Sequence, residues 1–343
     1  MERLDASPMT PVLSVVVCTL DQADYLRKAL GSLFEQTLSR ADYEVLVVDN
    51  GSTDSTKHVV ASFPGFVNLR YLYDPVPGLS HARNLGWQQA RGRYVAYLDD
   101  DAVASPRWLE RIRDRFETLV PRPAGVGGRI LGIWEAEKPA WLGDDLQPYL
   151  SIVDWPASPM FLDESRFYLA GTNVCYARTA LAECGGFPTD LGRKGLLLLS
   201  NEELWMQRIL LSRGKPLWYD PEILVHHHIK AHRLTPDWFL ERFFWQGVSD
   251  ALLEDRLARS GVPPRFRPRR FWHDLSGTAG DSIKLLAALL AGNADIVARC
   301  RIQERLGRSL SRLCLTYPGL EVPARSVFKR LRATGPLNSP KRS

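Results

Sequence analysis

Residues 93–102 read RYVAYLDDDA, a short apolar segment that ends in three consecutive aspartates. The apolar part has the composition of a buried parallel strand. Three adjacent carboxylates repel one another unless a cation lies between them, and Mg²⁺ and Mn²⁺ prefer carboxylate oxygens that they share with substrate phosphates. An aspartate-rich turn before a helix expected at Pro106–Thr118 is the alternative. We therefore expect a metal site at the end of a strand.

Upstream of this segment, β-branched runs alternate with amphipathic stretches. The runs predict strands at Leu13–Cys18, Glu44–Val48 and Leu69–Tyr73, and the stretches predict helices at Asp24–Phe34 and Leu79–Ala90. This rhythm is typical of a mostly parallel sheet with helices on both faces. Ligands of such sheets bind beyond the carboxyl ends of the strands.

Downstream, the pattern is less regular. Within residues 120–200, the stretch between predicted strands at Ala124–Ile133 and Tyr168–Ala177 is rich in Trp, Pro and Asp and indicates a long functional loop region. His226–Arg233 is also expected to be a loop. The remaining predicted strands and helices are Ala124–Ile133, Tyr168–Ala177, Glu202–Ser212, Leu217–Tyr219, Thr235–Leu252 and Asp281–Leu315.

Acidic residues form three clusters in an informative order. Asp49 and Asn50 end one predicted strand, Asp99–Asp101 end another, and Glu202 with Glu203 begin a predicted helix. The first two clusters belong to one edge of a parallel sheet. The glutamates suit proton transfer, although a helix N-terminus capped by Asn201 also favours acidic residues.

On these motifs the sequence resembles the GT-A glycosyltransferases of family 2, over residues 12–250. The matching segments are LSVVVCT, EVLVVDNGSTD, GLSHARNLGWQQARGRYVAYLDDDA, LAGTNVCYAR, ECGGF and LLSNEELWMQR. The resemblance implies an α/β GT-A fold with a Rossmann-like, mostly parallel sheet and a C-terminal helical extension. We expect a glycosyltransferase domain at 10–255 and a basic helical tail at 256–343.

The resemblance implies a nucleoside-diphosphate-sugar donor and its contacts. The residues expected to bind it are Thr19, Asp49, Asn50, Arg83, Asn84, Asp99 and Asp100. Thr19, Asp49 and Asn50 would face the base or ribose, and Arg83 and Asn84 the phosphates or ribose. Many relatives have aspartate in place of Asn50. Because asparagine both donates and accepts hydrogen bonds, GDP- and dTDP-linked donors stay open beside UDP.

The resemblance also implies a metal site and a catalytic base. Asp101, Asp99 and His227 are the expected ligands of Mn²⁺ or Mg²⁺, and surface histidines are the alternative for His227. Glu203 aligns with the base of an inverting transfer, and Glu202 is the fallback. The expected acceptor is a hydroxyl of a glycan or lipid-linked saccharide of a cell-surface polymer. A GT-A-fold scaffold that has lost catalysis is the rival hypothesis.

Other enzyme classes fit less well. A nucleotidyltransferase or a dinucleotide oxidoreductase needs a glycine-rich signature near the first strand, and LSVVVCTLDQADYL contains none. The five cysteines lack a CxxC pair, so neither a disulfide framework nor a zinc site is expected, and reduced thiols favour a cytoplasmic location.

Charge divides the chain unevenly. Residues 256–343 carry 18 Lys and Arg against 5 Asp and Glu, whereas the rest of the chain is net negative. A solvated helical face and an anionic membrane surface both explain this tail, and the latter would make the protein peripheral at the inner face of a membrane. No apolar run approaches the roughly 20 residues that span a bilayer. Nucleic-acid binding is not expected.

Overall fold

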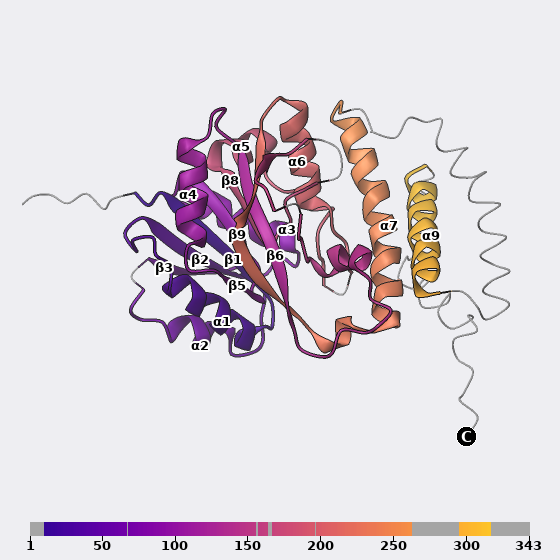
Figure 1. The fold of residues 1–343 in the computed structure, drawn as a ribbon, viewed down its shortest axis with the longest axis horizontal. Helices are drawn as coiled ribbons and strands as arrows, with labels where there is room; N and C mark the ends of the chain where they lie inside the picture. The colour runs from indigo at the N-terminus through magenta and orange to yellow at the C-terminus, as the bar shows by residue number, and fades with distance from the viewer. Residues whose placement is uncertain are drawn as a thin grey trace, which may run out of the picture. The chain divides into compact units, whose positions relative to one another are not determined.

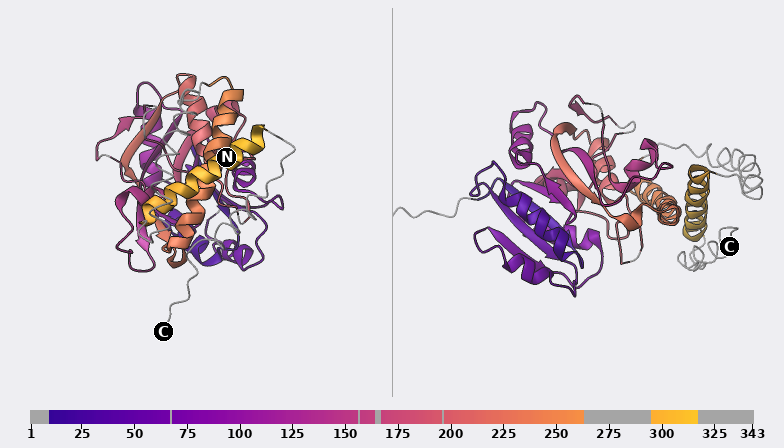
Figure 2. Two further views of the ribbon diagram at one scale, coloured as in Figure 1. Left: turned by 90° about the vertical axis from the view of Figure 1, so that its right-hand side faces the viewer. Right: turned by 60° about the horizontal axis from the view of Figure 1, so that its bottom comes forward.

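The computed structural model describes residues 10–66, 68–155, 157–163, 167–195, 197–262 and 295–316. Two compact units make up the chain (Figures 1 and 2). The first contains Met1–Gly195 and Glu202–Ala231, and the second contains Leu196–Asn201 and His232–Ser343. The expected division into domains at 10–255 and 256–343 stays a prediction.

The first unit is built on one mixed β-sheet. Within the described residues its strands lie in the order β3-β2-β1-β4-β8-β6-β9-β5, and β7 pairs with β9. The strands are β1 Leu13–Thr19, β2 Tyr43–Asp49, β3 Leu69–Tyr73, β4 Tyr94–Leu98, β5 Ala102–Ala104, β6 Gly125–Trp134, β7 Met160–Phe161, β8 Asn173–Ala177 and β9 Leu217–Ile229. Strands β1 to β4 are parallel, whereas β8 is antiparallel to β4 and β6.

Helices connect these strands and confirm the predicted α/β class. They are α1 Ala23–Phe34, α2 Thr56–Ala61, α3 Leu79–Gln89, α4 Trp108–Thr118, α5 Arg178–Cys184 and α6 Glu202–Ser212, with a 3-10 helix η1 at Asp144–Leu150. Gly86 brings α3 close to the sheet, because a Cβ at this position would overlap with the side chain of Val16 in β1. This close approach places the first turns of α3 beside the strand ends.

The predicted loop at His226–Arg233 is wrong in its first half, because β9 continues through Ile229. The predicted strand at Leu217–Tyr219 is therefore too short. The register between β6 and β9 shifts between Gly128 and Ile130, which lie opposite Asp220 and Val225, and pairing then resumes. As a result, β5 pairs with β9 and Ala102 lies opposite His227. The predicted strand at Tyr168–Ala177 is also too long, since β8 begins only at Asn173.

The second unit contains two long helices that pack against each other (Figures 1 and 2). Helix α7 (Pro236–Arg259) follows the 3-10 helix η2 (Ala231–Arg233), and the Thr235 hydroxyl caps it by accepting a hydrogen bond from the Trp238 N–H at 3.3 Å. Helix α9 (Ile296–Thr316) confirms the later part of the helix predicted at Asp281–Leu315.

Other sequence-based expectations have mixed outcomes. Residues 281–294, and the tail beyond 316, lie outside the described residues. All five cysteines are free thiols, as expected. In the described part of the chain, no helix has the length and apolar character needed to cross a bilayer.

Candidate active site

The first two acidic clusters meet at one edge of the sheet. Thr19 at the end of β1 pairs in register with Asp49 at the end of β2, and Asp99 directly follows β4, the other neighbour of β1. Thr19 and Asp49 are buried. The carboxyl ends of adjacent parallel strands thus carry the polar groups, as the sequence predicts.

Asp49 and Asn50 already have partners within the protein. Asp49 accepts hydrogen bonds from the Tyr71 hydroxyl at 2.6 Å and the Ser52 N–H at 2.8 Å. The Asn50 amide nitrogen donates to the carbonyls of Asp74 and Val76, and its oxygen accepts from a backbone N–H at 2.8 Å. Both donor hydrogens of Asn50 are therefore in use. An aspartate could not make these two bonds, which explains why asparagine stands here.

Asn84 binds the backbone of the turn that contains Gly185, Gly186 and Phe187. Its side-chain oxygen accepts from the Phe187 N–H at 2.8 Å, and its nitrogen donates to the Phe187 carbonyl at 2.8 Å. Gly185 and Gly186 in this turn have φ of +75° and +81°, values that favour glycine. Asn84 thus contacts the ECGGF segment, and its oxygen also accepts from Trp87 Nε1 at 3.1 Å. Its contact with a nucleotide stays a prediction.

Arg83 joins the aspartate cluster to the glutamate pair. Its Nη2 lies 3.4 Å from Asp99 Oδ1, and its Nη1 lies 2.6 Å from Glu202 Oε1. Gly171 leaves room for the guanidinium, since a Cβ there would lie 2.5 Å from Nη2. Burial lowers the pKa of Arg83, but the Glu202 and Asp99 carboxylates outweigh burial and raise the pKa above its usual value. The guanidinium is a permanent cation between two acidic groups.

The three aspartates have different surroundings. Asp99 accepts a second bond, at 2.5 Å, from the hydroxyl of Thr172. Burial, followed by the neighbouring Asp101 carboxylate, raises the pKa of Asp100 to about 8. Asp101 Oδ1 lies 3.1 Å from His227 Nε2, and Asp101 Oδ2 lies 3.1 Å from Lys230 Nζ. The cluster is therefore compensated by cations and donors from other elements.

Asp101 and His227 fit a divalent cation. The Nδ1 of His227 lies 3.0 Å from the Leu150 carbonyl, so that nitrogen carries a proton and Nε2 faces Asp101. A proton on Nε2 or a metal ion between Nε2 and Asp101 Oδ1 would each stabilise this contact of 3.1 Å. Neighbouring ligands of an octahedral ion, each about 2.1 Å from it, lie about 3.0 Å apart, which matches.

Within the described ranges, no group of three His, Cys, Asp or Glu side chains is arranged to hold a metal ion. Mg²⁺ and similar ions often take one or two protein carboxylates and complete their shell with substrate phosphates and water. Asp99, the other predicted ligand, instead has both carboxylate oxygens bonded, to Arg83 and Thr172. A metal held by Asp101 and His227 and completed by a diphosphate is compatible with this arrangement.

Lys230 is a site residue that the sequence did not indicate. Besides its ion pair with Asp101, Nζ donates to Gln22 Oε1 at 2.7 Å and lies 4.4 Å from the centre of the Tyr25 ring. Lys230 is 9% exposed, so the charge is held in place. Its partners come from α1 and the loop before it, more than 200 positions away in sequence, and no local pattern marks it.

The three adjacent histidines lie on β9, where successive side chains point to opposite faces of the strand. His227 faces Asp101, whereas His228 on the opposite side lies 3.2 Å from Glu135 Oε1, to which the Tyr25 hydroxyl also donates at 2.7 Å. Burial, followed by the charge of Lys28, lowers the pKa of His228. Among these histidines, only His227 directs a ring nitrogen at the aspartate cluster.

The glutamate pair begins helix α6. No donor among the described residues reaches Oε2 of Glu202 or Glu203. Burial, followed by the charge of Glu202, raises the pKa of Glu203 to about 8. Glu202 has the Arg83 guanidinium as its partner, so Glu203 is the carboxyl that can exchange a proton near neutral pH. The two predicted candidates for the base therefore differ in their environment.

The comparison with protein families gives the class of this protein. The model of glycosyl transferase family 2 matches residues 14–185, half of the chain, and the chain belongs to this family. It is a glycosyltransferase of a class that takes its sugar from a nucleotide-sugar donor. Family membership confirms the resemblance that the motifs indicated.

Individual relatives show how far along the chain the similarity extends. Glucosyl-dolichyl phosphate glucuronosyltransferase of Haloferax volcanii is 29% identical over 246 residues, which cover 71% of this chain and 77% of the relative. Glycosyltransferase AglE of the same organism is 40% identical over 103 residues, or 29% of this chain and 34% of the relative. Validoxylamine A glucosyltransferase of Streptomyces hygroscopicus subsp. jinggangensis is 36% identical over 109 residues, or 31% and 26%. The matched region thus spans about a third or less of the latter two.

A solved structure confirms the fold. Mannosyltransferase PcManGT from Pyrobaculum calidifontis, in complex with GDP-Man and Mn²⁺, superposes with a TM-score of 0.55 at 19% identity and covers 95% of this chain and 81% of its own. At this identity the likeness establishes the GT-A-like fold alone.

Proposed function

We propose that this chain transfers a sugar from a nucleoside-diphosphate-sugar to a hydroxyl acceptor, with a divalent metal and with inversion at the anomeric carbon. The supporting observation is Arg83, whose guanidinium contacts Asp99 on one side and Glu202 on the other. One buried cation therefore links the aspartates proposed to bind the donor to the glutamates proposed to act on the acceptor.

Asp101 and His227 would hold Mn²⁺ or Mg²⁺, which when bound would neutralise charge on the donor's diphosphate. Thr19, Asp49 and Asn50 would face the nucleoside. Because both donor hydrogens of Asn50 are bonded to backbone carbonyls, this residue offers a base only its oxygen. The identity of the base stays open among UDP-, GDP- and dTDP-linked donors.

Glu203 is the proposed base. In its ionised form it removes the proton of the acceptor hydroxyl while that oxygen forms a bond to the anomeric carbon and the bond from this carbon to the diphosphate breaks. The proton ends on Glu203, and the electron pair of the broken bond leaves with the nucleoside diphosphate. Glu202 is less suited, since its carboxylate is paired with Arg83 at 2.6 Å.

The acceptor we propose is a lipid-linked saccharide. The name of the Haloferax volcanii relative describes such an acceptor, a dolichyl phosphate that carries glucose. A cytoplasmic protein whose tail contacts the anionic inner face of a membrane would suit this acceptor. In α9, however, Arg301, Arg308 and Arg312 are paired with acidic residues of the second unit, so a membrane contact must rest on other tail residues.

Thermal-shift measurements test the donor site. UDP, GDP, dTDP and CDP are each added to the full chain, with Mn²⁺ and with EDTA. A ligand that binds only the folded state raises the melting temperature. We expect one nucleotide to shift it, in Mn²⁺ and not in EDTA, and Asp101→Ala to lose that shift. If none of the four shifts it under either condition, the proposed donor site is wrong.

A further inference from the structure

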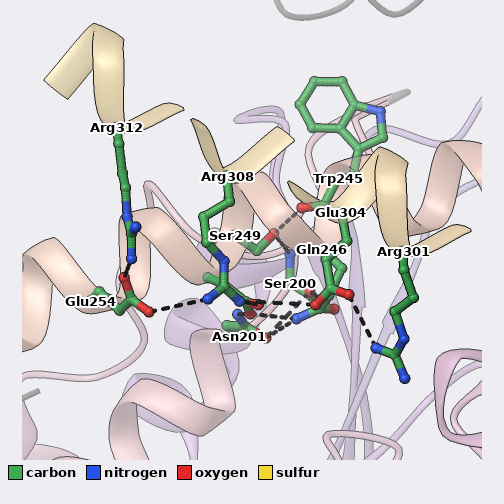
Figure 3. A network of polar contacts seen from close by, with 11 residues as sticks. Ser200, Asn201, Trp245, Gln246, Ser249, Glu254, Arg301, Glu304, Arg308 and Arg312 are labelled. Atoms are coloured by element: carbon green, nitrogen blue, oxygen red, sulfur yellow. Dashed lines mark hydrogen bonds and ion pairs between the residues drawn. The ribbon is translucent and has the colours of Figure 1, made fainter. Parts of the chain in front are cut away.

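The residues directly before α6 are held by side chains of α7 (Figure 3). Ser200 donates its backbone N–H to Ser249 Oγ at 3.0 Å. The Asn201 side-chain nitrogen donates to Asp250 Oδ1 at 2.9 Å, and its oxygen accepts from Gln246 Nε2 at 3.1 Å. Asn201 is 6% exposed. Asn201, the residue before α6, is therefore held by side-chain hydrogen bonds within the second unit.

The backbone of Asn201 is left-handed, with φ of +77°. Asparagine tolerates this conformation better than most residues other than glycine, and the side-chain bonds hold it there. Asp250 fixes the orientation of the amide, since a carboxylate only accepts and must face the NH₂ group. Glu202, the first residue of α6, follows Asn201 in the chain. A shift at Asn201 thus passes directly into the first helical turn.

Asp250 depends in turn on α9. Its Oδ2 pairs with the Arg308 guanidinium, while Gln246 donates to its Oδ1 at 2.7 Å. The α7 and α9 backbones are in contact beside this pair, because a Cβ on Gly247 would overlap with the Glu304 carbonyl. Likewise, a Cβ on Gly307, the neighbour of Arg308, would overlap with a carbonyl of α7. Besides Asp250, the Arg308 guanidinium lies 3.6 Å from Glu254 and 3.9 Å from Glu304, so three carboxylates surround it.

We propose that Arg308 is a positioning residue for the catalytic base, acting through Asp250 and Asn201. The inference rests on Glu203 as the base of the proposed function. Without Arg308, the Asp250 carboxylate loses its cation and turns toward water, Asn201 loses its acceptor, and the first turn of α6 opens. Glu203 then moves and becomes more hydrated, whereas Asp49, Asp99 and Asp101 keep their partners.

Arg312 provides a matched control. It lies one turn after Arg308 on α9 and pairs with Glu254 of α7 at 2.7 Å. Glu254 also lies 3.6 Å from Arg308 Nη1, but within the described residues no hydrogen bond or ion pair joins Glu254 to Asn201. Arg308→Gln and Arg312→Gln each remove one arginine from the same helix pair. Hydrogen exchange of the full chain is then measured for the peptide spanning residues 198–206. We expect exchange there to accelerate about tenfold or more in Arg308→Gln only.

The catalytic part is tested by hydrolysis of UDP-glucose and GDP-mannose in Mn²⁺. Arg308→Gln should lower kcat about 10- to 100-fold, leave KM within about twofold, and move the acidic limb of the pH profile to lower pH, because hydration lowers the pKa of Glu203. Arg308→Lys should restore part of kcat. Unchanged exchange in Arg308→Gln, or equal acceleration in Arg312→Gln, would overturn the proposal.

Two further outcomes separate the hypotheses. Accelerated exchange with wild-type kcat and pH profile would contradict a role of Arg308 in positioning the base. If the wild-type protein neither binds a nucleoside diphosphate nor hydrolyses either donor, the proposed function fails and the catalytic role of Arg308 fails with it. The exchange measurement would still decide whether Arg308 holds the start of α6.

Discussion

Asp101 and Glu203 are both acidic residues of the candidate site, yet their surroundings differ. Asp101 has His227 Nε2 and Lys230 Nζ at 3.1 Å from its two oxygens. Glu203 has an oxygen that no donor reaches and the negative charge of Glu202 nearby. Asp101 thus has the Lys230 ammonium against one of its oxygens, whereas burial and the Glu202 charge raise the pKa of Glu203.

This difference matches the chemistry proposed for each residue. A carboxylate that binds a metal must stay ionised, and nearby cations achieve this. A general base must take up a proton and release it, which is most efficient when its pKa lies near the working pH. The pKa of Glu203, raised to about 8 by burial and by Glu202, meets this requirement.

The largest expected effect follows removal of the base. Glu203→Gln keeps the shape of the side chain but cannot accept the acceptor proton. We expect kcat to fall by about 10² to 10⁴, with the Mn²⁺-dependent thermal shift by the nucleoside diphosphate unchanged. Glu202→Gln is the comparison, because it removes the carboxylate that pairs with Arg83 and leaves Glu203 in place. If Glu202→Gln abolishes transfer while Glu203→Gln retains it, the roles of the two glutamates are exchanged.

Asp101→Asn tests the other side of the comparison. An amide in place of the carboxylate removes a charged metal ligand, and a bound metal is worth several kcal/mol of charge stabilisation. We expect Mn²⁺-dependent turnover to fall about 100-fold or more, with the melting temperature in EDTA close to that of the wild type. Titration of turnover with Mn²⁺ checks this. Wild-type turnover at low Mn²⁺ would exclude Asp101 as a ligand.

The pH dependence of activity and of stability tests the raised pKa of Glu203. Since the base must be ionised, kcat/KM should rise by up to about tenfold per pH unit below about 8 and level off above it. The contribution of Glu203 to the free energy of unfolding depends on pH in the opposite direction. The folded protein binds the Glu203 proton more tightly than the unfolded chain, whose value lies near 4.5, so this stabilising contribution is complete below that pH and is lost as pH rises through about 8.

Melting temperatures in EDTA from pH 5 to 9 measure that loss. The wild type should lose more stability over this range than Glu203→Gln, which has no carboxyl to ionise. Asp100→Asn should reduce the loss in the same way, since the pKa of Asp100 is also raised to about 8. Parallel curves for the wild type and Glu203→Gln would show that Glu203 titrates normally.

Much of this site could be predicted from the sequence because its acidic residues follow local patterns. Three aspartates after an apolar strand, and two glutamates before an amphipathic helix, are visible within a dozen residues. The parallel direction of β1, β2 and β4 followed from the same alternation of strands and helices. Their mutual placement did not require long-range information, since the carboxyl ends of parallel strands share an edge.

The partners of these acids could not be predicted, because they come from distant positions without a pattern of their own. Thr172 and Asp99 are 73 positions apart, and Arg308 and Asp250 are 58 apart. The environment of His227 depended on the register between β5 and β9, whereas the sequence predicted a strand that ends at Tyr219 and a loop at His226–Arg233. Ion pairs of this kind depend on the tertiary structure alone.

The smallest expected effect concerns Lys230. Its ammonium group stabilises ionised Asp101 but also repels a metal ion bound to the same carboxylate. Lys230→Met should therefore strengthen Mn²⁺ binding in the absence of nucleotide by up to about tenfold, the free energy that corresponds to one pKa unit. The spectroscopic signal of unbound Mn²⁺ measures this binding. Lys28→Met is the control, because the exposed Lys28 lies 5.3 Å from the same Tyr25 ring. Weaker Mn²⁺ binding in Lys230→Met alone would mean that the lysine chiefly holds Asp101 in its ligating orientation.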